Sequence, residues 1–409
     1  MISALWRYAD PHSTPVQAMF PMDCDLLITG GTVIDPASGK NGAFDLAVRE
    51  GKIWRVEPDL STLQSEIKLD ARGLLVTPGL IDLHVHVYPR HTRLGLDPDP
   101  LAAAGGVTTM LDTGSAGSRN FAGFRKDVID RAETRILALV NLSCIGLAAD
   151  DLGELMDRRY ADPQGVLRTL KQHPGVAVGV KIRAGKHIIG EGPAAWANFR
   201  EAVEAARQSN TWLMVHIGES PMSVPEMLEH LAPGDCITHC FKGGSTRILD
   251  EQGQLFPEVQ AAVQRGVTFD VGHGFGSFEW ETATQALAQG FEPTTISTDL
   301  HTLNVHGPVY DLPTTLSKFL MLGLSLPRVI EMATLSPAKI LGLSHLIGTL
   351  RPGSLADIAL FEKRTGRFLF TDSYRQTRTG TELLTAAATI RGGQLLAPAG
   401  SLRSRHLAQ

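Results

Sequence analysis

Short apolar runs alternate with helical patterns through the middle of the chain, between residues 76 and 345. Eight such runs lie at residues 80–87, 107–114, 135–142, 176–184, 212–219, 236–241, 267–274 and 294–301. Between two of them, the segment 194–208 repeats its apolar residues about every 3.6 positions, as an amphipathic helix does. Near-continuous apolar strands separated by helices are typical of a parallel sheet that is covered on both faces. We therefore expect the α/β class, with a closed (β/α)8 barrel over residues 76–345 that carries the catalytic site.

The two ends of the chain have a different texture. Residues 23–75 hold short β-type segments separated by turns rich in glycine and proline, and a similar texture returns in residues 346–400. This similarity predicts one small β-sandwich domain that is built from both chain termini. We expect residues 1–22 to form a loosely ordered extension and residues 401–409 to form a tail.

Composition narrows the choice of partners. The 409 residues carry a formal net charge of −5, which gives no general attraction to nucleic acid or to anionic membranes. No apolar run reaches the roughly 18 residues that a membrane span needs, and the first 21 residues lack the pattern of a secretory signal. The four cysteines form no CxxC pair, as is typical of buried thiols in a reducing compartment. We expect a cytoplasmic protein that acts on a small molecule.

Several polar residues interrupt the apolar runs near their C-terminal ends. They are His84, His86, Lys181, His216, His239 and Asp299. In a (β/α)8 barrel these strand ends face the active site, so the six side chains are expected to meet at one mouth. A single buried histidine is ordinarily a hydrogen-bonded core residue, but an uncompensated buried charge is costly, and shared metal binding removes that cost for the whole set. Imidazole and carboxylate ligands without thiolate suit Zn²⁺, and also Mn²⁺ or Co²⁺.

Lys181 is the odd member of this set, because an ammonium group repels a metal ion. Burial beside cations lowers the pKa of a lysine, and the neutral amine can add CO₂ to form a carbamate. The two oxygens of a carbamate are enough to bridge two ions. The sequence thus predicts a CO₂-derived carbamate on Lys181 between two divalent metal ions, Zn²⁺ first among them; the alternative is an ordinary ion-paired lysine.

Taken together, HVH, the fourth-strand lysine, VHIGE, THC and STD resemble motifs of the amidohydrolase superfamily of metal-dependent hydrolases. The flanking β segments and the closing IGTLRPGSLADIALFE resemble the same superfamily, so the resemblance extends over nearly the whole chain from about residue 23. It implies that His84, His86 and Asp299 hold one metal ion, that His216 and His239 hold the other, and that carboxylated Lys181 bridges them. A homo-oligomer is an expectation at the level of the superfamily.

A narrower resemblance concerns the substrate. KIRAG, THCFKG and STDLHTLNVHGPVYDLPTTLSKFL resemble a bacterial deacetylase-like subgroup. Its members hydrolyse acetylated small carboxylic acids, as esters of hydroxy acids or as amides of amino acids. The resemblance therefore implies a binuclear deacetylase or esterase in which a metal-bridging hydroxide attacks the acetyl group. Asp299 would be the general base that takes the proton of the hydroxide and returns it to the leaving group.

Three further residues are candidate substrate contacts. Arg183 lies two residues after Lys181, on the same face of a regular strand, and its guanidinium suits a substrate carboxylate. The alternative for Arg183 is a structural ion pair. His273 ends the seventh run and Lys242 follows His239. For these two, the alternatives are a hydrogen-bonded loop support and a solvated charge.

Three other functions compete with the deacetylase. A mononuclear deaminase is suggested by VHIGE and VGHG, which resemble motifs of adenosine deaminases and would make Glu219 the group that protonates the purine; such a site needs neither Lys181 nor His239. A cyclic-amide hydrolase of the dihydroorotase kind would use the same two-metal site. A non-enzymatic barrel scaffold is expected to have lost some of the ligands. The remaining loop histidines, His91, His187, His301 and His306, are expected not to bind metal.

Overall fold

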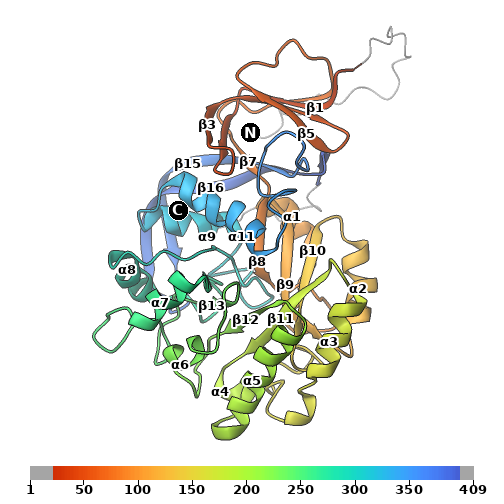
Figure 1. Cartoon of the computed structure of the whole chain (residues 1–409). Coiled ribbons are helices and arrows are strands. Elements are labelled where there is room, and N and C mark those ends of the chain that lie inside the picture. Colours follow the sequence, from red (N-terminus) through yellow and green to blue (C-terminus); the bar gives the residue numbers. More distant parts are fainter. Residues whose placement is uncertain (1–21, 397–409) are drawn as a thin grey trace.

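The computed structural model describes residues 22–396, and its larger part is a parallel β barrel surrounded by helices (Figure 1). Seven parallel strands form one sheet in the order β14-β13-β12-β11-β10-β9-β8. They are β8 (Leu80–Val85), β9 (Val107–Gly117), β10 (Arg135–Asn141), β11 (Ala177–Arg183), β12 (Trp212–His216), β13 (Cys236–Thr238) and β14 (Thr268–Asp270). The neighbours in this sheet are also neighbours in the sequence, as in a barrel that is built from successive strand–helix units.

The eighth apolar run closes the ring without forming a regular strand. Thr295 makes a parallel bridge to Asp270 of β14, and Leu300 makes one to Val85 of β8. Between these bridges the backbone N–H of Thr298 donates to the buried carboxylate of Asp82 at 3.0 Å instead of to a neighbouring strand. The predicted barrel is confirmed, with an eighth position that is held by isolated bridges and side-chain hydrogen bonds.

Helices follow the barrel strands and cover their outer face (Figure 1). They are α1 (Pro98–Gly105), α2 (Phe121–Asp127), α3 (Pro163–Gln172), α4 (Lys186–Ile189), α5 (Gly192–Gln208), α6 (Val224–Leu228), α7 (Pro257–Arg265), α8 (Trp280–Ala288), α9 (Leu312–Met321), α10 (Leu326–Met332) and α11 (Leu335–Ile340), with 3₁₀ turns at Ile129–Arg131 and Arg158–Tyr160. The amphipathic pattern at 194–208 is confirmed by α5, which buries Phe199, Ala202 and Ala206. None of the described helices combines the length and the apolar character that crossing a membrane requires.

The smaller part of the molecule is a pair of sheets at one end of the barrel (Figure 1). One sheet has the order β5-β4-β1-β6, and the other has the order β17-β16-β15-β7-β2-β3. The N-terminal strands are β1 (Cys24–Thr29), β2 (Thr32–Asp35), β3 (Lys40–Ala43), β4 (Asp45–Arg49), β5 (Lys52–Glu57), β6 (Ser65–Asp70) and β7 (Leu75–Pro78); the C-terminal ones are β15 (Ile358–Thr371), β16 (Thr377–Arg391) and β17 (Gln394–Leu395). Leu26, Val48, Ile358 and Ile390 share one apolar core. The predicted sandwich of both termini is therefore confirmed.

The long hairpin β15–β16 reaches beyond this sandwich. Phe368, Phe370, Leu383 and Leu384 in its outer half are buried in the same apolar core as the barrel helices. The turn of the hairpin, residues 372–376, thereby comes to lie beside the loop that follows β14, where Ser373 Oγ donates to His273 O at 3.1 Å. Residues 1–21 of the predicted extension 1–22, and the predicted tail at 401–409, lie outside the described residues.

Candidate active site

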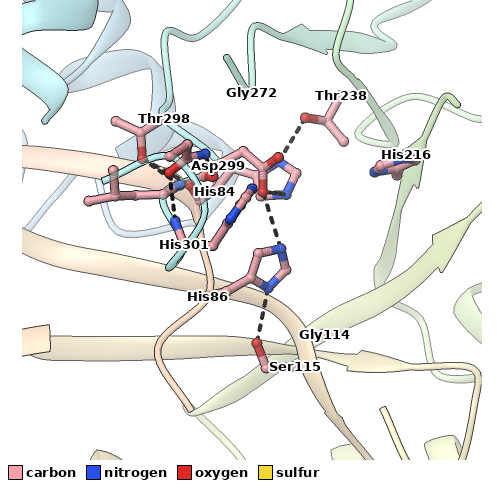
Figure 2. A network of polar contacts seen from close by, with 12 residues as sticks. His84, His86, Gly114, Ser115, His216, Thr238, Gly272, Thr298, Asp299 and His301 are labelled. Carbon is pink, nitrogen blue, oxygen red and sulfur yellow. Dashed lines mark hydrogen bonds and ion pairs between the residues drawn. The ribbon is translucent and has the colours of Figure 1, made fainter. Parts of the chain in front are cut away.

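All six predicted ligand side chains gather at the C-terminal ends of the barrel strands. His84 lies on β8, His86 follows the end of β8, Lys181 lies on β11, His216 ends β12, His239 follows β13, and Asp299 lies in the eighth segment. Figure 2 shows His84 and His86 turned toward the carboxylate of Asp299, as expected for residues two apart on one strand. Asp299 Oδ1 lies 3.3 Å from His84 Nε2 and 3.2 Å from His86 Nε2.

The other members complete a continuous cluster. His239 Nε2 lies 2.7 Å from His216 Nδ1, and the ring of His239 is 5.1 Å from that of His84. Ligand atoms of His84, His239 and Asp299 all lie within 4.8 Å of one another, close enough to hold one ion. Lys181 Nζ lies 3.3 Å from His84 Nε2.

Hydrogen bonds behind the cluster fix how three imidazoles point. His239 Nδ1 donates to the carbonyl of Gly272 at 2.6 Å. His84 Nδ1 faces Thr238 Oγ1 at 2.8 Å, and because this hydroxyl donates its hydrogen to Asp270 at 2.7 Å, His84 must be the donor to it. His86 Nδ1 contacts Ser115 Oγ at 3.0 Å (Figure 2). The Nε2 atoms of His84 and His239 thus carry no hydrogen, and each keeps a lone pair that points into the cluster, the arrangement that a metal ion requires of a ligand.

Burial keeps these imidazoles neutral. Loss of hydration lowers the pKa of His86 and of His239 to about 4, and it holds the pKa of His84 and of His216 well below 6.5. Neutral imidazole is the form that binds a metal ion, so the cluster needs no proton release before binding. The donor set, its tautomers and its protonation state therefore all fit a divalent ion.

The backbone is strained at two of the six positions. His239 and Asp299 have positive φ angles of 74° and 50°. For residues other than glycine this conformation costs on the order of 1–3 kcal/mol and recurs at functional sites. Asp299 is held in it by its backbone N–H, which donates to His84 O at 2.7 Å. The strain has a clear use, because it turns both side chains into the cluster.

Lys181 is buried without the partners that a charged lysine needs. Its side chain is almost fully buried, and its contacts are His84 Nε2 and the thioether of Met214, the latter at 3.3 Å. Among residues 22–396 no carboxylate forms an ion pair with it. Burial lowers its pKa to about 8. Gly114, at φ 86°, passes so close that a β-carbon there would lie 2.9 Å from Lys181 Cβ.

The three candidate substrate contacts lie at the same mouth, each already in contact with protein groups. The guanidinium of Arg183 pairs with the buried carboxylate of Glu154 at 3.2 Å and stays 15% exposed. Lys242 Nζ pairs with Glu219 at 2.5 Å and donates to Gly243 O at 2.8 Å. The ring of His273 is fully buried, and both of its nitrogens contact protein groups, Gly274 O and Lys318 Nζ. This geometry favours the loop-support alternative for His273.

Comparison with known proteins agrees with this geometry. Residues 75–395 match the Amidohydrolase family. This protein belongs to the Amidohydrolase family. A deacetylase of Agrobacterium fabrum is 35% identical over 87% of the chain and 88% of its own length, and a deacetylase of Enterococcus faecalis is 34% identical over 91% and 99%. Among solved structures, an adenine deaminase has a TM-score of 0.84 at 33% identity over 91% of this chain and 99% of its own. A dihydroorotase has a TM-score of 0.83 at 32% identity over 90% and 98%.

Membership confirms that the chain is an enzyme, a hydrolase, and it removes the non-enzymatic scaffold from the alternatives. The match includes β7 and β15–β17 of the sandwich, and strands β1–β6 lie before it. Which amidohydrolase reaction the site carries out depends on the residues around the six-residue cluster.

Sequence reasoning missed several of those surrounding residues in this amidohydrolase. His301, assigned to a loop, is buried, and its ring lies 6.3 Å from that of His86 (Figure 2). Thr238, Asp270 and Ser115 orient the imidazoles but were not singled out. Their sequence signal was available, because Thr238 and Asp270 are polar residues within apolar runs and Ser115 directly follows one. Lys318, inside the apolar helical pattern of α9, carries a signal of the same kind.

Proposed function

We propose that this amidohydrolase is a deacetylase that cleaves the acetyl ester or amide of small hydroxy or amino acids. One observation carries the proposal: the cluster is complete, with four neutral imidazoles, one carboxylate and one buried lysine at a single barrel mouth. The two relatives named deacetylases, which match over nearly nine-tenths of the chain, support the acetyl group as the part that is removed.

The donor set fits two divalent ions, with Zn²⁺ the first choice for imidazole and carboxylate ligands. His84, His86 and Asp299 would hold one ion, and His216 and His239 would hold the other. Lys181, as its carbamate, would bridge them, and its burial without a carboxylate partner supports this role. Bound ions would supply an acidified water at neutral pH and an electrophile for the substrate carbonyl.

The chain itself supplies the proton transfer. Asp299 keeps Oδ1 against His84 and His86, and its Oδ2 faces the space that the missing side chain of Gly274 leaves open. A β-carbon at Gly274 would lie 2.7 Å from that oxygen. Oδ2 would take the proton of the attacking water and return it to the oxygen or nitrogen that leaves the acetyl group, so that no net proton is consumed.

The carboxylate of the substrate would bind at Arg183. In the ion pair of Arg183 with Glu154, the guanidinium of Arg183 stays partly exposed, whereas the carboxylate of Glu154 is fully buried. A guanidinium that is held by one carboxylate still has donors for a second, and bidentate recognition suits a small acid. Lys242 is a weaker candidate, because Glu219 and Gly243 O already occupy its ammonium group.

The test combines metal content with a substrate panel. Protein prepared without chelators and with bicarbonate should contain about two metal ions per chain by elemental analysis. It should release acetate from O-acetyl hydroxy acids or N-acetyl amino acids, with both enantiomers of each substrate assayed. About one ion per chain, unchanged after zinc and bicarbonate are added, would contradict the bridging role of Lys181. No acetate release from any member of the panel would contradict the deacetylase.

Two alternatives rest on specific likenesses. The solved structure titled as an adenine deaminase makes deamination the second candidate, with Glu219 as the proton donor. Here Glu219 is half-exposed and is held by Lys242 and by Ser245, whose Oγ lies 2.7 Å away. The structure titled as a dihydroorotase makes ring opening of a cyclic amide the third. Ammonia release from adenine, or ring opening of dihydroorotate, without acetate release would move the corresponding alternative to the front.

A further inference from the structure

Lys318 is a second fully buried lysine, outside the cluster, on helix α9. Its Nζ contacts three acceptors: His273 Nε2 at 2.6 Å, Pro308 O at 2.8 Å and Thr371 O at 2.8 Å. Among the residues that the structure describes, no carboxylate forms an ion pair with it. Asp311 instead caps α9 through Thr314 N at 2.7 Å. The ammonium group is therefore satisfied by dipoles and an imidazole.

The three acceptors match the three hydrogens of an ammonium group. His273 Nδ1 contacts Gly274 O at 3.0 Å, and because a carbonyl can only accept, Nδ1 carries the ring proton. His273 Nε2 then has a free lone pair that accepts from Lys318. A neutral amine would offer only two hydrogens to three acceptors. The aromatic faces of Phe278 and Trp280, each 6.0 Å from Nζ, also favour a cation here.

The three contacts tie together segments that are far apart in the sequence. His273 belongs to the loop after β14, Pro308 precedes α9, and Thr371 ends β15 at the tip of the C-terminal hairpin. The ring of His273 is further stacked on Phe278, with centroids 4.6 Å apart. Lys318 thus fixes the position of His273 from one side while Phe278 fixes its plane from the other.

Both neighbours of His273 touch the metal-binding cluster. The carbonyl of Gly272 accepts from His239 Nδ1 at 2.6 Å and so sets which nitrogen of His239 faces the cluster. Gly274 lies against Asp299 Oδ2, where no side chain would fit. The two glycines have φ angles of 46° and 61°, which glycine adopts without strain. The backbone N–H groups of His273 and Gly274 donate to Ser297 O at 3.2 Å and Thr298 O at 2.9 Å, so Lys318 adds a side-chain anchor to a stretch that the eighth segment also holds. A displacement of His273 would move both contacts at once.

We propose that Lys318 is a positioning residue for the active site, which holds the loop 272–274 through His273 and thereby orients His239 and keeps Asp299 free. The C-terminal hairpin takes part through Thr371 O, so the smaller sheet region contributes to the site without touching substrate. This inference rests on the proposed function, because it assumes that His239 and Asp299 bind metal. In this proposal His273 is the link between Lys318 and the loop, because its Nε2 contacts Lys318 and its Nδ1 contacts Gly274 O.

The experiment measures metal binding separately from activity. Chelator-treated protein is titrated with Zn²⁺ by calorimetry, and with Co²⁺, whose visible spectrum reports the ligand geometry. Lys318→Met keeps the length and burial of the side chain but donates no hydrogen bond. We expect it to weaken metal affinity about tenfold, as the loss of groups behind metal ligands does, and to change the Co²⁺ spectrum. His273→Gln should give a similar loss.

Ser317→Ala is the matched control. Ser317 is buried on the same helix and accepts from Leu384 N of the hairpin at 2.9 Å, but it does not contact the loop 272–274. Its affinity for Zn²⁺ should stay within about twofold of the wild type. A double variant of Lys318→Met and His273→Gln should lose no more than either single variant, because both break one chain of contacts.

Hydrogen exchange of residues 271–275 in metal-free protein tests the clamp alone. Faster exchange in Lys318→Met, together with weaker metal binding, supports the proposal. Faster exchange with unchanged metal affinity overturns the positioning role and leaves Lys318 as a structural residue. Additive losses in the double variant, or an equal loss in Ser317→Ala, overturn it as well. Failure of the wild type to bind any divalent metal overturns the proposed function. That result comes from the wild-type protein, whereas the positioning role is tested on the variants. If Lys318→Met does not fold, His273→Gln carries the same test.

Discussion

Two lysines of this protein are buried to the same degree and have opposite surroundings. Lys181 is 1% exposed and Lys318 is 0% exposed. Lys181 meets one imidazole nitrogen and a thioether, which accepts only weakly. Lys318 meets two carbonyl oxygens and an imidazole, one acceptor for each hydrogen of its ammonium group. Burial alone therefore does not decide what a lysine does.

The difference is one of chemical use. Burial lowers the pKa of Lys181 to about 8 and that of Lys318 to about 7, so each lysine is easier to deprotonate than one in water. At Lys181 few hydrogen-bond acceptors stabilise the ammonium form, so the amine can lose its proton and would then be able to react with CO₂. At Lys318 the three acceptors would lose a donor. The first surrounding suits a covalent modification and the second suits a fixed clamp.

The largest expected effect is the loss of activity in Lys181→Met. Because this change would remove the proposed carbamate and its two metal-binding oxygens, electrophilic activation worth several kcal/mol would be lost, and hydrolysis should fall by about 10²–10³-fold. Lys318→Met should cost far less activity. Steady-state rates of both variants, measured with zinc and bicarbonate present, check the contrast. Equal losses in the two variants would show that the two lysines do not differ in the way their surroundings indicate.

Direct detection of the carbamate sharpens the same contrast. Wild-type protein that is loaded with zinc in ¹³C-labelled bicarbonate should show a carbamate carbon signal by NMR. The signal should persist in Lys318→Met and disappear in Lys181→Met, because only Lys181 combines burial with the absence of strong acceptors among the described residues. A signal that survives in Lys181→Met would place the carbamate on another amine.

Lys318→Met should lose more stability than Lys181→Met, the reverse of their expected order in activity loss. Lys318→Met leaves three buried acceptors without a donor, and we expect it to lower the free energy of unfolding of metal-free protein by about 1–3 kcal/mol. Lys181→Met removes a buried amine with one good contact, and replacing such a group by an apolar one is often neutral, within about 1 kcal/mol. Urea unfolding at pH 7 compares the two. A larger loss for Lys181→Met would contradict the assignment.

The last expected effect is a pH dependence of stability to which Lys318 contributes. Its folded pKa, about 7, lies below the ordinary value of 10.5. Between these pH values the unfolded chain binds more protons than the folded chain, so the free energy of unfolding rises with pH, by at most about 1.4 kcal/mol per pH unit. The difference between wild type and Lys318→Met should therefore grow from pH 7 to pH 10. A difference that does not change with pH would mean that the acceptors hold the proton throughout this range.

Much of the barrel and all six members of the cluster could be predicted from the sequence. Near-continuous apolar runs are a local property of the chain, and parallel strands place their C-terminal ends at one face, so polar residues at those ends had to meet. The same reasoning placed His84 and His86 on one face, as Figure 2 shows. It also expected a regular eighth strand, where Asp82 instead takes the backbone hydrogen bond of Thr298 and only isolated bridges remain.

The sequence by itself determined which residues gather at the barrel mouth, because the C-terminal ends of parallel barrel strands meet at one face. Only the tertiary structure decided which groups contact and orient the residues around this mouth. The partner of Arg183 is Glu154, 29 positions away, and the partners of Lys318 come from three separate segments. Loops have no period that a sequence pattern could reveal, so the contacts they make, and with them the difference between the two buried lysines, appear only once the chain has folded.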